Sequence, residues 1–465
     1  MSKQLHDAII FSQDGYIYAD DSNESQIGSQ ASSVNDGNFI QGVMNLFPGG
    51  LVKLNPQAGY PFRISNPLTN LYGVSLKGKT RTHTILQGIG AVSPILDFGS
   101  ISNPAYNGSD IEHAGAVPDF TMEDLRITRN LNGASKTGTK GFRIRTSDDG
   151  ALSTMRNVDF DGSEINVVLG DAANSCMAWG NQRFERCKFG AWNGRDKVGV
   201  LLSLAANNVF DTCHFQGYDG SGSAGLLSES SNFHDCDVFL TNSYFRSRSW
   251  ELYGADADYN IRWDSGIVFR MEQCQLEDGH IANCAIRDGI DIKVTGSNFG
   301  GCGRTGVGLY VGNPQGGRDI TSIRVVGNSM QYVGGIPIKV EKNSSAYCPT
   351  TVVIGKNNIR YSGDDNGGGV MLWDVVGYDV SHNTIVCDVA GSCGVHSGSS
   401  TIGISLGQIK HNIIEFLVAS ANNKGIRLRN GCNYNDVFRN TILKNGGQGI
   451  VNQGSNNNIE PGVEF

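Results

Sequence analysis

The sequence has no excess of basic residues, and it contains no long apolar runs. Its 465 residues include 37 Lys and Arg against 45 Asp and Glu, which gives a formal net charge of −8. A protein that binds nucleic acid needs a stripe of cations to release counterions from the phosphate backbone, so no nucleic-acid partner is expected. No apolar run is long enough to span a membrane, and MSKQLHDAII at the start is too polar for a signal peptide. We therefore expect that the protein is not inserted into a membrane. We also expect that it is made in a cytosol, unless a targeting region is missing.

Cysteine spacing and proline content exclude further classes. The 11 cysteines are odd in number and include no CxxC pair and no Cys/His group with zinc spacing, so neither a disulfide framework nor a metal site is expected. A GxGxxG match at Gly301, Gly303 and Gly306 does not lie between a strand and a long helix, which argues against a dinucleotide site. We expect no cofactor. With only 11 prolines and continuous apolar periodicity, the 62 glycines indicate turns and close-packed corners rather than disorder.

A short motif returns about every 29 residues through two-thirds of the chain. It consists of a strand, a polar or small residue, any residue and an apolar residue. The late copies read VGNSM, GKNNI, SHNTI, KHNII and FRNTI. The polar or small position is occupied in turn by Leu125, Val158, Cys187, Cys213, Ser243, Cys274, Ser297, Asn328, Asn357, Asn383, Asn412 and Asn440. Self-similarity at this period predicts a solenoid whose units bury their apolar faces on their neighbours.

A second signal in each unit predicts another strand. It has the form Gly, apolar, any, apolar, as in GFRIR from Gly141, GVGLY from Gly306, GVMLW from Gly369 and GIRLR from Gly425. Alternation with period two places one set of these side chains inside and the other on the surface. Three short strands per turn, Gly-rich corners and a stacked Asn/Ser/Cys column resemble the right-handed parallel β-helix of the pectate lyase superfamily. We therefore predict an all-β, right-handed parallel β-helix of about twelve coils.

The N-terminal third carries a related resemblance. GNFIQGVMNLF over residues 37–47 predicts a short amphipathic helix that caps the open end of the solenoid. It is followed by GGLVKLNPQAGYPF and LYGVSLKGKTRTHTILQG, an order that resembles the opening coils of phage tailspikes and other pectate-lyase-like proteins. The predicted organisation is a polar arm or linker over 1–36, the capping helix and opening coils over 37–118, the main β-helix over 119–455 and a tail over 456–465.

This resemblance implies that a polysaccharide lies along one sheet or between the subunits of a trimer. The sheet in question is the one formed by the Gly-apolar strands. One outward row is predicted to place Glu229, Tyr253, Arg287, Tyr310, Lys339 and Trp373 on successive coils, with Glu251 in the row beside it. Aromatic side chains can stack on sugar rings, and cations can pair with an acidic polymer. We predict substrate binding by Tyr253, Arg287, Tyr310, Lys339, Trp373 and Trp263.

An insertion after Tyr253, GADADYNIRWDSG, carries clustered carboxylates and aromatic residues. A long loop on a regular solenoid is usually functional. Hydrolysis of a glycoside uses one protonated and one ionised carboxyl group. The predicted catalytic residues are Glu229, Glu251, Asp256 and Asp258. Solvated surface carboxylates and aromatic residues at a subunit interface are the alternative interpretations of the same residues.

The favoured function is therefore a tailspike-like depolymerase that hydrolyses a bacterial capsule or O-antigen polysaccharide. Two alternatives stay open. One is a metal-independent lyase that acts by β-elimination on a uronate, using Arg287, Lys339, Tyr253 and Tyr310. The other is a spike that binds polysaccharide without cleaving it. The resemblance also implies a homotrimer, a place in the virion tail after synthesis in the host cytoplasm, and contacts between residues 1–36 and other tail proteins.

Overall fold

In the computed structural model the chain folds as an all-β, right-handed parallel β-helix, which confirms the predicted fold class. The structure describes residues 7–31, 35–57, 59–99, 117–131, 135–145, 147, 151–174, 176–191, 196–218, 221–229, 236–246, 258–302, 306–312, 320–342, 349–361, 368–399, 406–460 and 462–464. The chain divides into two compact units, Met1–Tyr218 with Gly225–Val238, and Asp219–Ala224 with Phe239–Phe465. Within each unit, successive turns add strands to three parallel sheets, named A, B and C.

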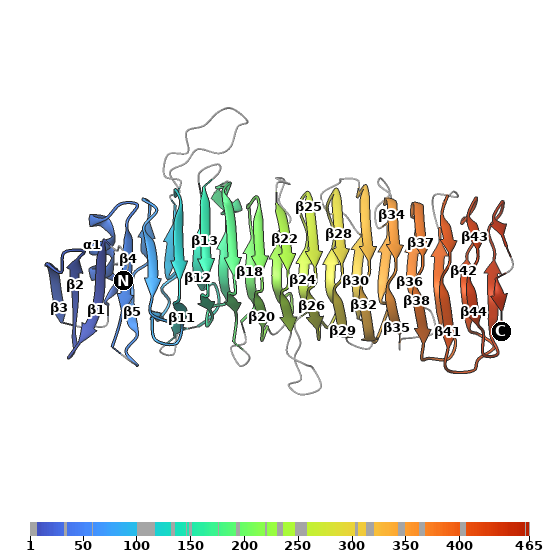
Figure 1. The fold of residues 1–465 in the computed structure, drawn as a ribbon, viewed down its shortest axis with the longest axis horizontal. Helices are drawn as coiled ribbons and strands as arrows, with labels where there is room; N and C mark the ends of the chain where they lie inside the picture. Colours follow the sequence, from blue (N-terminus) through green and yellow to red (C-terminus); the bar gives the residue numbers. More distant parts are fainter. Residues whose placement is uncertain are drawn as a thin grey trace, which may run out of the picture. The chain divides into compact units, whose positions relative to one another are not determined.

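The first unit contains the strands drawn in blue to green in Figure 1. Its sheet A contains β4 (Leu51–Asn55), β7 (Ser75–Gly78), β10 (Phe120–Glu123), β13 (Leu152–Arg156), β16 (Asn181–Glu185) and β19 (Asn208–Asp211). Sheet B contains β5 (Phe62–Ile64), β8 (Ile85–Ile89), β11 (Arg126–Asn130), β14 (Asp159–Phe160), β17 (Lys188–Phe189) and β20 (His214–Gln216). Sheet C contains β6 (Leu68–Asn70), β9 (Leu96–Phe98), β12 (Lys140–Ile144), β15 (Ile165–Leu169) and β18 (Val198–Leu202), and a short 3-10 helix, η1 (Ala172–Asn174), follows β15. The division between the units falls within β21 (Ala224–Ser228) and β22 (Asp237–Thr241).

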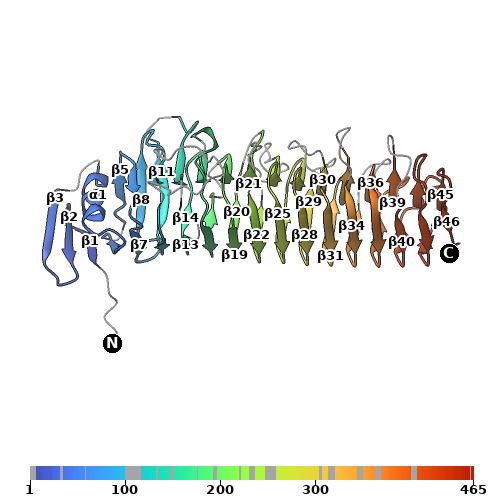
Figure 2. The same ribbon diagram turned by 90° about the horizontal axis from the view of Figure 1, so that it is seen from above.

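The second unit repeats this construction (Figure 2). Its sheet A contains β25 (Val268–Glu272), β28 (Asp291–Thr295), β31 (Ser322–Val326), β34 (Thr350–Gly355), β37 (Val376–Ser381), β40 (Gln408–Lys410), β43 (Asp436–Phe438) and β46 (Asn458–Ile459). Sheet B contains β23 (Tyr244–Arg246), β26 (Gln275–Glu277), β29 (Asn298–Cys302), β32 (Ser329–Val333), β35 (Asn358–Tyr361), β38 (Thr384–Cys387), β41 (Ile413–Phe416), β44 (Thr441–Leu443) and β47 (Val463–Glu464). Sheet C contains β24 (Tyr259–Trp263), β27 (Ala282–Ile286), β30 (Val307–Gly312), β33 (Ile338–Glu341), β36 (Gly368–Trp373), β39 (Cys393–Gly398), β42 (Lys424–Leu428) and β45 (Gln448–Asn452).

Alternating side chains fill the interior of each unit. In β31, Ile323 and Val325 are buried while Arg324 between them is exposed. In the first unit, Phe160, Phe189 and Phe215 come from successive strands of sheet B, and their ring centroids lie 5.4 and 4.6 Å apart. Stacking the same residue type turn after turn buries apolar area without strain, which explains why the sequence repeats.

The corner between sheets A and B carries the repeat motif. The residue before each repeat position has a left-handed backbone, with φ between 49° and 70°. These residues are Asp124, Asn157, Arg186, Thr212, Asn242, Gln273, Gly296, Gly327, Lys356, His382, His411 and Arg439. The late asparagines then form the predicted column: in each turn the side-chain Nδ2 donates to the Oδ1 of the asparagine in the next turn, for instance from Asn357 to Asn383 at 2.9 Å. The column satisfies buried backbone groups at the corners where these asparagines lie.

Both terminal ranges contain strands. The expected arm over 1–36 contains three strands, β1 (Ala8–Gln13), β2 (Tyr16–Asp21) and β3 (Gln26–Ala31), and β1 pairs parallel to β4 and antiparallel to β2. The polar run after Asp20 forms the turn between β2 and β3. Within the expected tail over 456–465, β46 and β47 pair with β43 and β44. Short alternating strands between polar turns have the composition of a linker, so the sequence does not reveal them.

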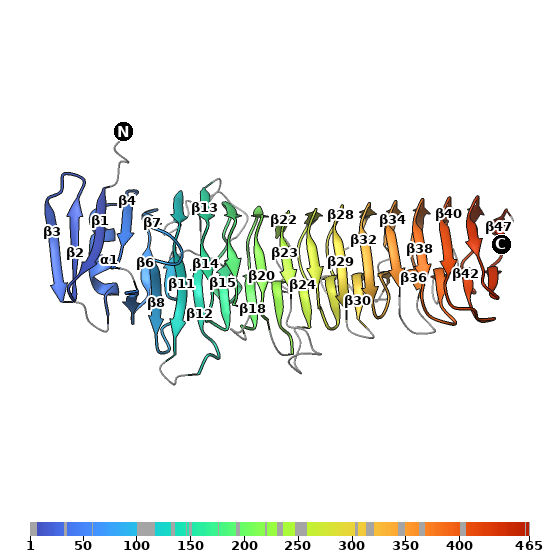
Figure 3. The ribbon, with the colours of Figure 1, turned by 60° about the horizontal axis from the view of Figure 1, so that its bottom comes forward.

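The helix expected at residues 37–47 is present as α1 (Gly37–Leu46) (Figure 3). It contacts β5 and β6, and it buries Ile40, Val43 and Met44. Leu46, the last residue of the helix, is 59% exposed. Its role as a cap stays a prediction. Among the residues that the structure describes, no helix has the length and apolar character needed to cross a membrane.

Candidate functional site

The outward side chains of sheet C in the second unit form two rows. The first row is fixed by strand pairing and contains Arg262, Ala285, Tyr310, Lys339, Met371, His396 and Arg427. In the second row Gly312 pairs with Glu341, Glu341 with Trp373, and Trp373 with Gly398. Arg287 lies at the same level, one residue beyond the Ile286–Val311 pair. The predicted single row of Arg287, Tyr310, Lys339 and Trp373 is therefore wrong in register, because Tyr310 and Lys339 belong to the row beside it.

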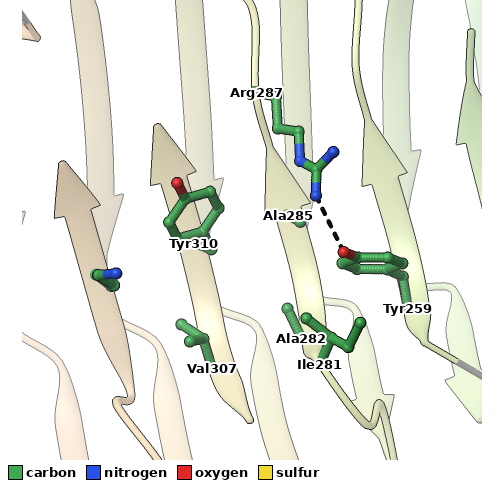
Figure 4. Close-up of a pocket in the computed structure, with 8 residues that line it drawn as sticks. Tyr259, Ile281, Ala282, Ala285, Arg287, Val307 and Tyr310 are labelled. Atoms are coloured by element: carbon green, nitrogen blue, oxygen red, sulfur yellow. Dashed lines mark hydrogen bonds between the residues drawn. The ribbon is translucent and has the colours of Figure 1, made fainter. Parts of the chain in front are cut away.

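A cavity of about 310 Å³ opens on this face (Figure 4). Its lining residues are Tyr259, Ile281, Ala282, Ala285, Arg287, Val307, Tyr310 and Lys339. Arg287 points toward Tyr259, and its Nη2 donates to the Tyr259 hydroxyl at 3.0 Å. The ammonium of Lys339 lies 5.4 Å from the centre of the Tyr310 ring. The cavity thus combines a small apolar floor with two cations and two aromatic rings.

Glu341 connects this cavity to the next part of the sheet. The Tyr310 hydroxyl donates to its Oε1 at 2.9 Å, and the Lys339 ammonium lies 2.7 Å from its Oε2. Sequence reasoning missed Glu341. Glu341 lies two residues after Lys339 on the same strand, so strand alternation predicts that it faces outward. The correct register places it level with Trp373.

A second acidic side chain, Asp264, is buried beside Tyr259. Its Oδ2 lies 2.5 Å from Arg262 Nη2, and its Oδ1 lies 3.6 Å from Arg287 Nη1. Burial disfavours the charge of Arg262, yet the hydrogen bond to Asp264 and its charge raise the pKa of Arg262 above the ordinary value. Asp264 therefore pairs with Arg287, which lines the cavity, and with Arg262 on the neighbouring strand β24.

Trp263 does not reach the surface, so its predicted role in substrate binding is wrong. The side chain is fully buried and packs edge-on against Phe269, with ring centroids 5.6 Å apart. The expected insertion contains strand β24, in which Ile261 and Trp263 both face the interior. Strand alternation explains the error, since the motif YNIRW reads equally well as an aromatic loop.

Of the four predicted catalytic carboxylates, the structure describes Glu229 and Asp258. Asp258 accepts from the backbone N of Gly222 at 2.6 Å and its own N lies 3.3 Å from Ser223 Oγ, so it stabilises a turn. Glu229 belongs to the first unit, is exposed, and accepts from Ser203 Oγ at 2.7 Å. Glu251, Asp256 and the predicted binding residue Tyr253 lie outside the described residues.

Trp373, predicted to bind substrate, lies at a second cavity on the same sheet. This cavity is lined by Glu341, Met371, Trp373, His396 and Arg429. The Arg429 guanidinium lies 5.5 Å from the centre of the Trp373 ring. Four of the predicted binding residues therefore lie at the two cavities of this face. The first cavity contains Arg287, Tyr310 and Lys339, and the second contains Trp373.

Comparisons with known proteins give likenesses of fold. No family of known proteins and no curated protein matches the sequence. Among solved structures, tailspike protein 3 of bacteriophage CBA120 is 11% identical over 91% of this chain and 57% of its own, with a TM-score of 0.49. The Dettilon tailspike protein is 11% identical over 89% of this chain and 64% of its own (TM-score 0.40), and the A-module of the Azotobacter vinelandii mannuronan C-5 epimerase AlgE4 is 14% identical over 92% and 97% (TM-score 0.38). At these identities and TM-scores the likenesses do not bear on function.

Proposed function

We propose that the protein binds and cleaves an acidic bacterial surface polysaccharide, with sheet C of the second unit as the face that holds the polymer. The observation that supports this most directly is the cavity in which Arg287 and Lys339 accompany Tyr259 and Tyr310. Cations that flank an apolar, aromatic floor match a sugar ring that carries a carboxylate. A cavity of about 310 Å³ is within the range of small-ligand sites.

The cavity favours cleavage by β-elimination. This reaction removes the proton at C5 of a uronate, breaks the bond between C4 and the glycosidic oxygen, and leaves a C4–C5 double bond while the departing oxygen gains a proton. Lys339 or Arg287 would neutralise the carboxylate so that charge can develop beside it. Tyr310 and Glu341, whose hydroxyl and carboxylate are 2.9 Å apart, would carry the two protons.

Hydrolysis is the second candidate, because Glu341 places one carboxylate at the boundary between the two cavities. A glycosidase needs another carboxyl group about 5–9 Å away. Glu251 and Asp256 keep that role as predictions. A homotrimer, a place in the virion tail and contacts of residues 1–36 with other tail proteins also remain predictions that rest on the tailspike resemblance.

The test is incubation of the purified protein with a panel of acidic capsular and O-antigen polysaccharides. Reducing ends and the ultraviolet absorbance of unsaturated uronate are followed together. We expect both to rise, and we expect Tyr310→Phe and Lys339→Met each to lower kcat by about 100-fold or more. Arg324→Ala, which removes an exposed cation from sheet A, should leave kcat unchanged and serves as the matched control.

Other outcomes decide against parts of the proposal. Reducing ends without absorbance would move the assignment to hydrolysis. Binding without either signal across the panel would leave a polysaccharide-binding spike. Full activity in Tyr310→Phe and Lys339→Met would place the reaction elsewhere on the molecule.

A further inference from the structure

The second cavity on sheet C has an aromatic wall held in one position. Its volume is about 290 Å³. The Trp373 ring lies directly over Gly398, where a Cβ atom would overlap its six-membered ring. His396 meets the same ring edge-on, with centroids 6.2 Å apart and an interplanar angle of 89°. Gly398, His396 and Arg429 therefore together fix the orientation of Trp373.

His396 brings an unpartnered polar atom to this cavity. The residue is only 2% exposed, and its Nε2 has no hydrogen-bond partner among the described residues. Burial, followed by the charges of Arg429, Arg427 and Lys424, lowers the pKa of His396 to about 4. The ring is thus neutral near pH 7. A buried polar group without a partner is costly, which points to a ligand atom that occupies the cavity during function.

Two arginines beside His396 also lack partners. The Nε atoms of Arg427 and Arg429 are buried without a hydrogen bond, and neither guanidinium forms an ion pair within the described part of the chain. Burial and the neighbouring charge of Arg427 lower the pKa of Arg429. Like charges held this close repel each other, so an anion placed between them would relieve the repulsion and satisfy both guanidinium groups.

We propose that this cavity is a second subsite, which takes the carboxylate of a uronate-type sugar against Arg427, Arg429 and His396 while the sugar ring stacks on Trp373. The substrate class rests on the function proposed above. The two cavities meet at Glu341, and the strands from β27 to β42 span roughly 24 Å at the spacing of parallel strands, so one polymer chain can occupy both. The repeated positive charge would then select a polymer with acidic sugars at more than one position.

The test measures the binding of methyl glucuronide to the protein. The NMR signals of the His396 ring and the Trp373 indole report the binding, and methyl glucoside serves as the neutral probe. We expect saturable shifts with the glucuronide and at least tenfold weaker binding of the glucoside. Arg429→Met should weaken glucuronide binding at least tenfold because it removes a cation. Gly398→Ala should do the same because it displaces the Trp373 ring, and Arg324→Ala on sheet A should bind as the unmodified protein does.

Equal binding of the two probes, or unchanged binding in both Arg429→Met and Gly398→Ala, would overturn the subsite. The proposed function is tested separately by cleavage of polymer and its dependence on Tyr310. Glucuronide binding without cleavage of any polymer would keep the subsite and reject the depolymerase. Cleavage that depends on Tyr310, with glucuronide absent from the second cavity, would keep the depolymerase and reject the subsite.

Discussion

At the scale of single residues, the burial of His396 makes the stability of the protein depend on pH. Its pKa in the folded protein is about 4, below the ordinary value of 6.5. As the pH falls below 6.5, the unfolded chain takes up a proton that the folded protein does not, so the folded state loses stability until about pH 4. A shift of this size corresponds to a loss of about 3 kcal/mol.

His396→Phe should remove this contribution, because phenylalanine has a similar ring and no titrating nitrogen. We expect the free energy of unfolding of the variant, relative to the unmodified protein, to rise by about 3 kcal/mol between pH 7 and pH 4. Urea denaturation at a series of pH values measures the difference. If the two proteins lost stability in parallel over this range, His396 would not be a buried neutral histidine.

The register error at Tyr310 and Lys339 shows where residue-level prediction stops. The motif GVGLY has two glycines, and reading it from Gly306 rather than Gly308 moves Tyr310 by two positions. A slip of two residues keeps every side chain on the same face, so hydrophobic alternation cannot reveal it. Only the pairing of the backbones distinguishes the two rows. The same pairing reveals that Glu341 lies close to Tyr310.

At the scale of structural elements, the asparagine column determines the corners between sheets A and B. The Asn383 side chain is buried, donates to the carbonyl of Ile354 at 3.0 Å and to Asn412 at 2.9 Å, and accepts from the backbone N of Asn357 at 3.0 Å. Asn383→Ala leaves these buried groups without partners. We expect it to lower the free energy of unfolding by about 3–5 kcal/mol, since each unsatisfied group costs roughly 1–3 kcal/mol.

Asn358→Ala is the control for this prediction, because Asn358 is the same residue type, is exposed, and begins a strand of sheet B next to the column. Its effect should stay within about 0.5 kcal/mol. Equal losses in the two variants, measured by urea denaturation, would show that the column contributes no more than any surface asparagine.

The elements with a strong repeat were predictable, and those outside it were not. Each repeat position from Leu125 to Asn440 precedes a strand of sheet B, because a buried side chain has to fit the same corner in every turn. Strands β1 to β3 do not carry the motif, so the sequence does not predict them. Strand β24 was read as a loop for the same reason, which hid the buried position of Trp263.

At the scale of the whole molecule, a chain of net charge −8 presents cations at the two cavities of sheet C. Lys339 lines the first cavity, Arg429 lines the second, and Arg427 pairs with His396 on the neighbouring strand. Arg427 and Arg429 have no acidic partner within the described residues. Under the proposed function, an acidic polymer is attracted to these cations over short distances.

Salt should weaken this attraction. At an ionic strength of 0.15 M charges are screened beyond about 8 Å, and at 1 M beyond about 3 Å. We expect the affinity for an acidic polysaccharide, measured by co-sedimentation or surface plasmon resonance, to fall at least tenfold between these two conditions. Arg429→Met should lower the affinity in dilute salt and show a shallower dependence on salt. An affinity that did not change with salt would mean that stacking and hydrogen bonds, rather than the cations, hold the polymer.

The most direct measurement of the central claim compares one acidic polysaccharide with the same polymer after its carboxyl groups have been reduced to alcohols. The two substrates share length, linkage and sugar rings, so any difference in cleavage reports the carboxylates alone. We predict that the protein cleaves the acidic polymer and that the rate falls by about 100-fold or more on the reduced one, because the reduced polymer has no carboxylates for Arg287, Lys339 and Arg429 to bind. Equal cleavage of both polymers would contradict the account.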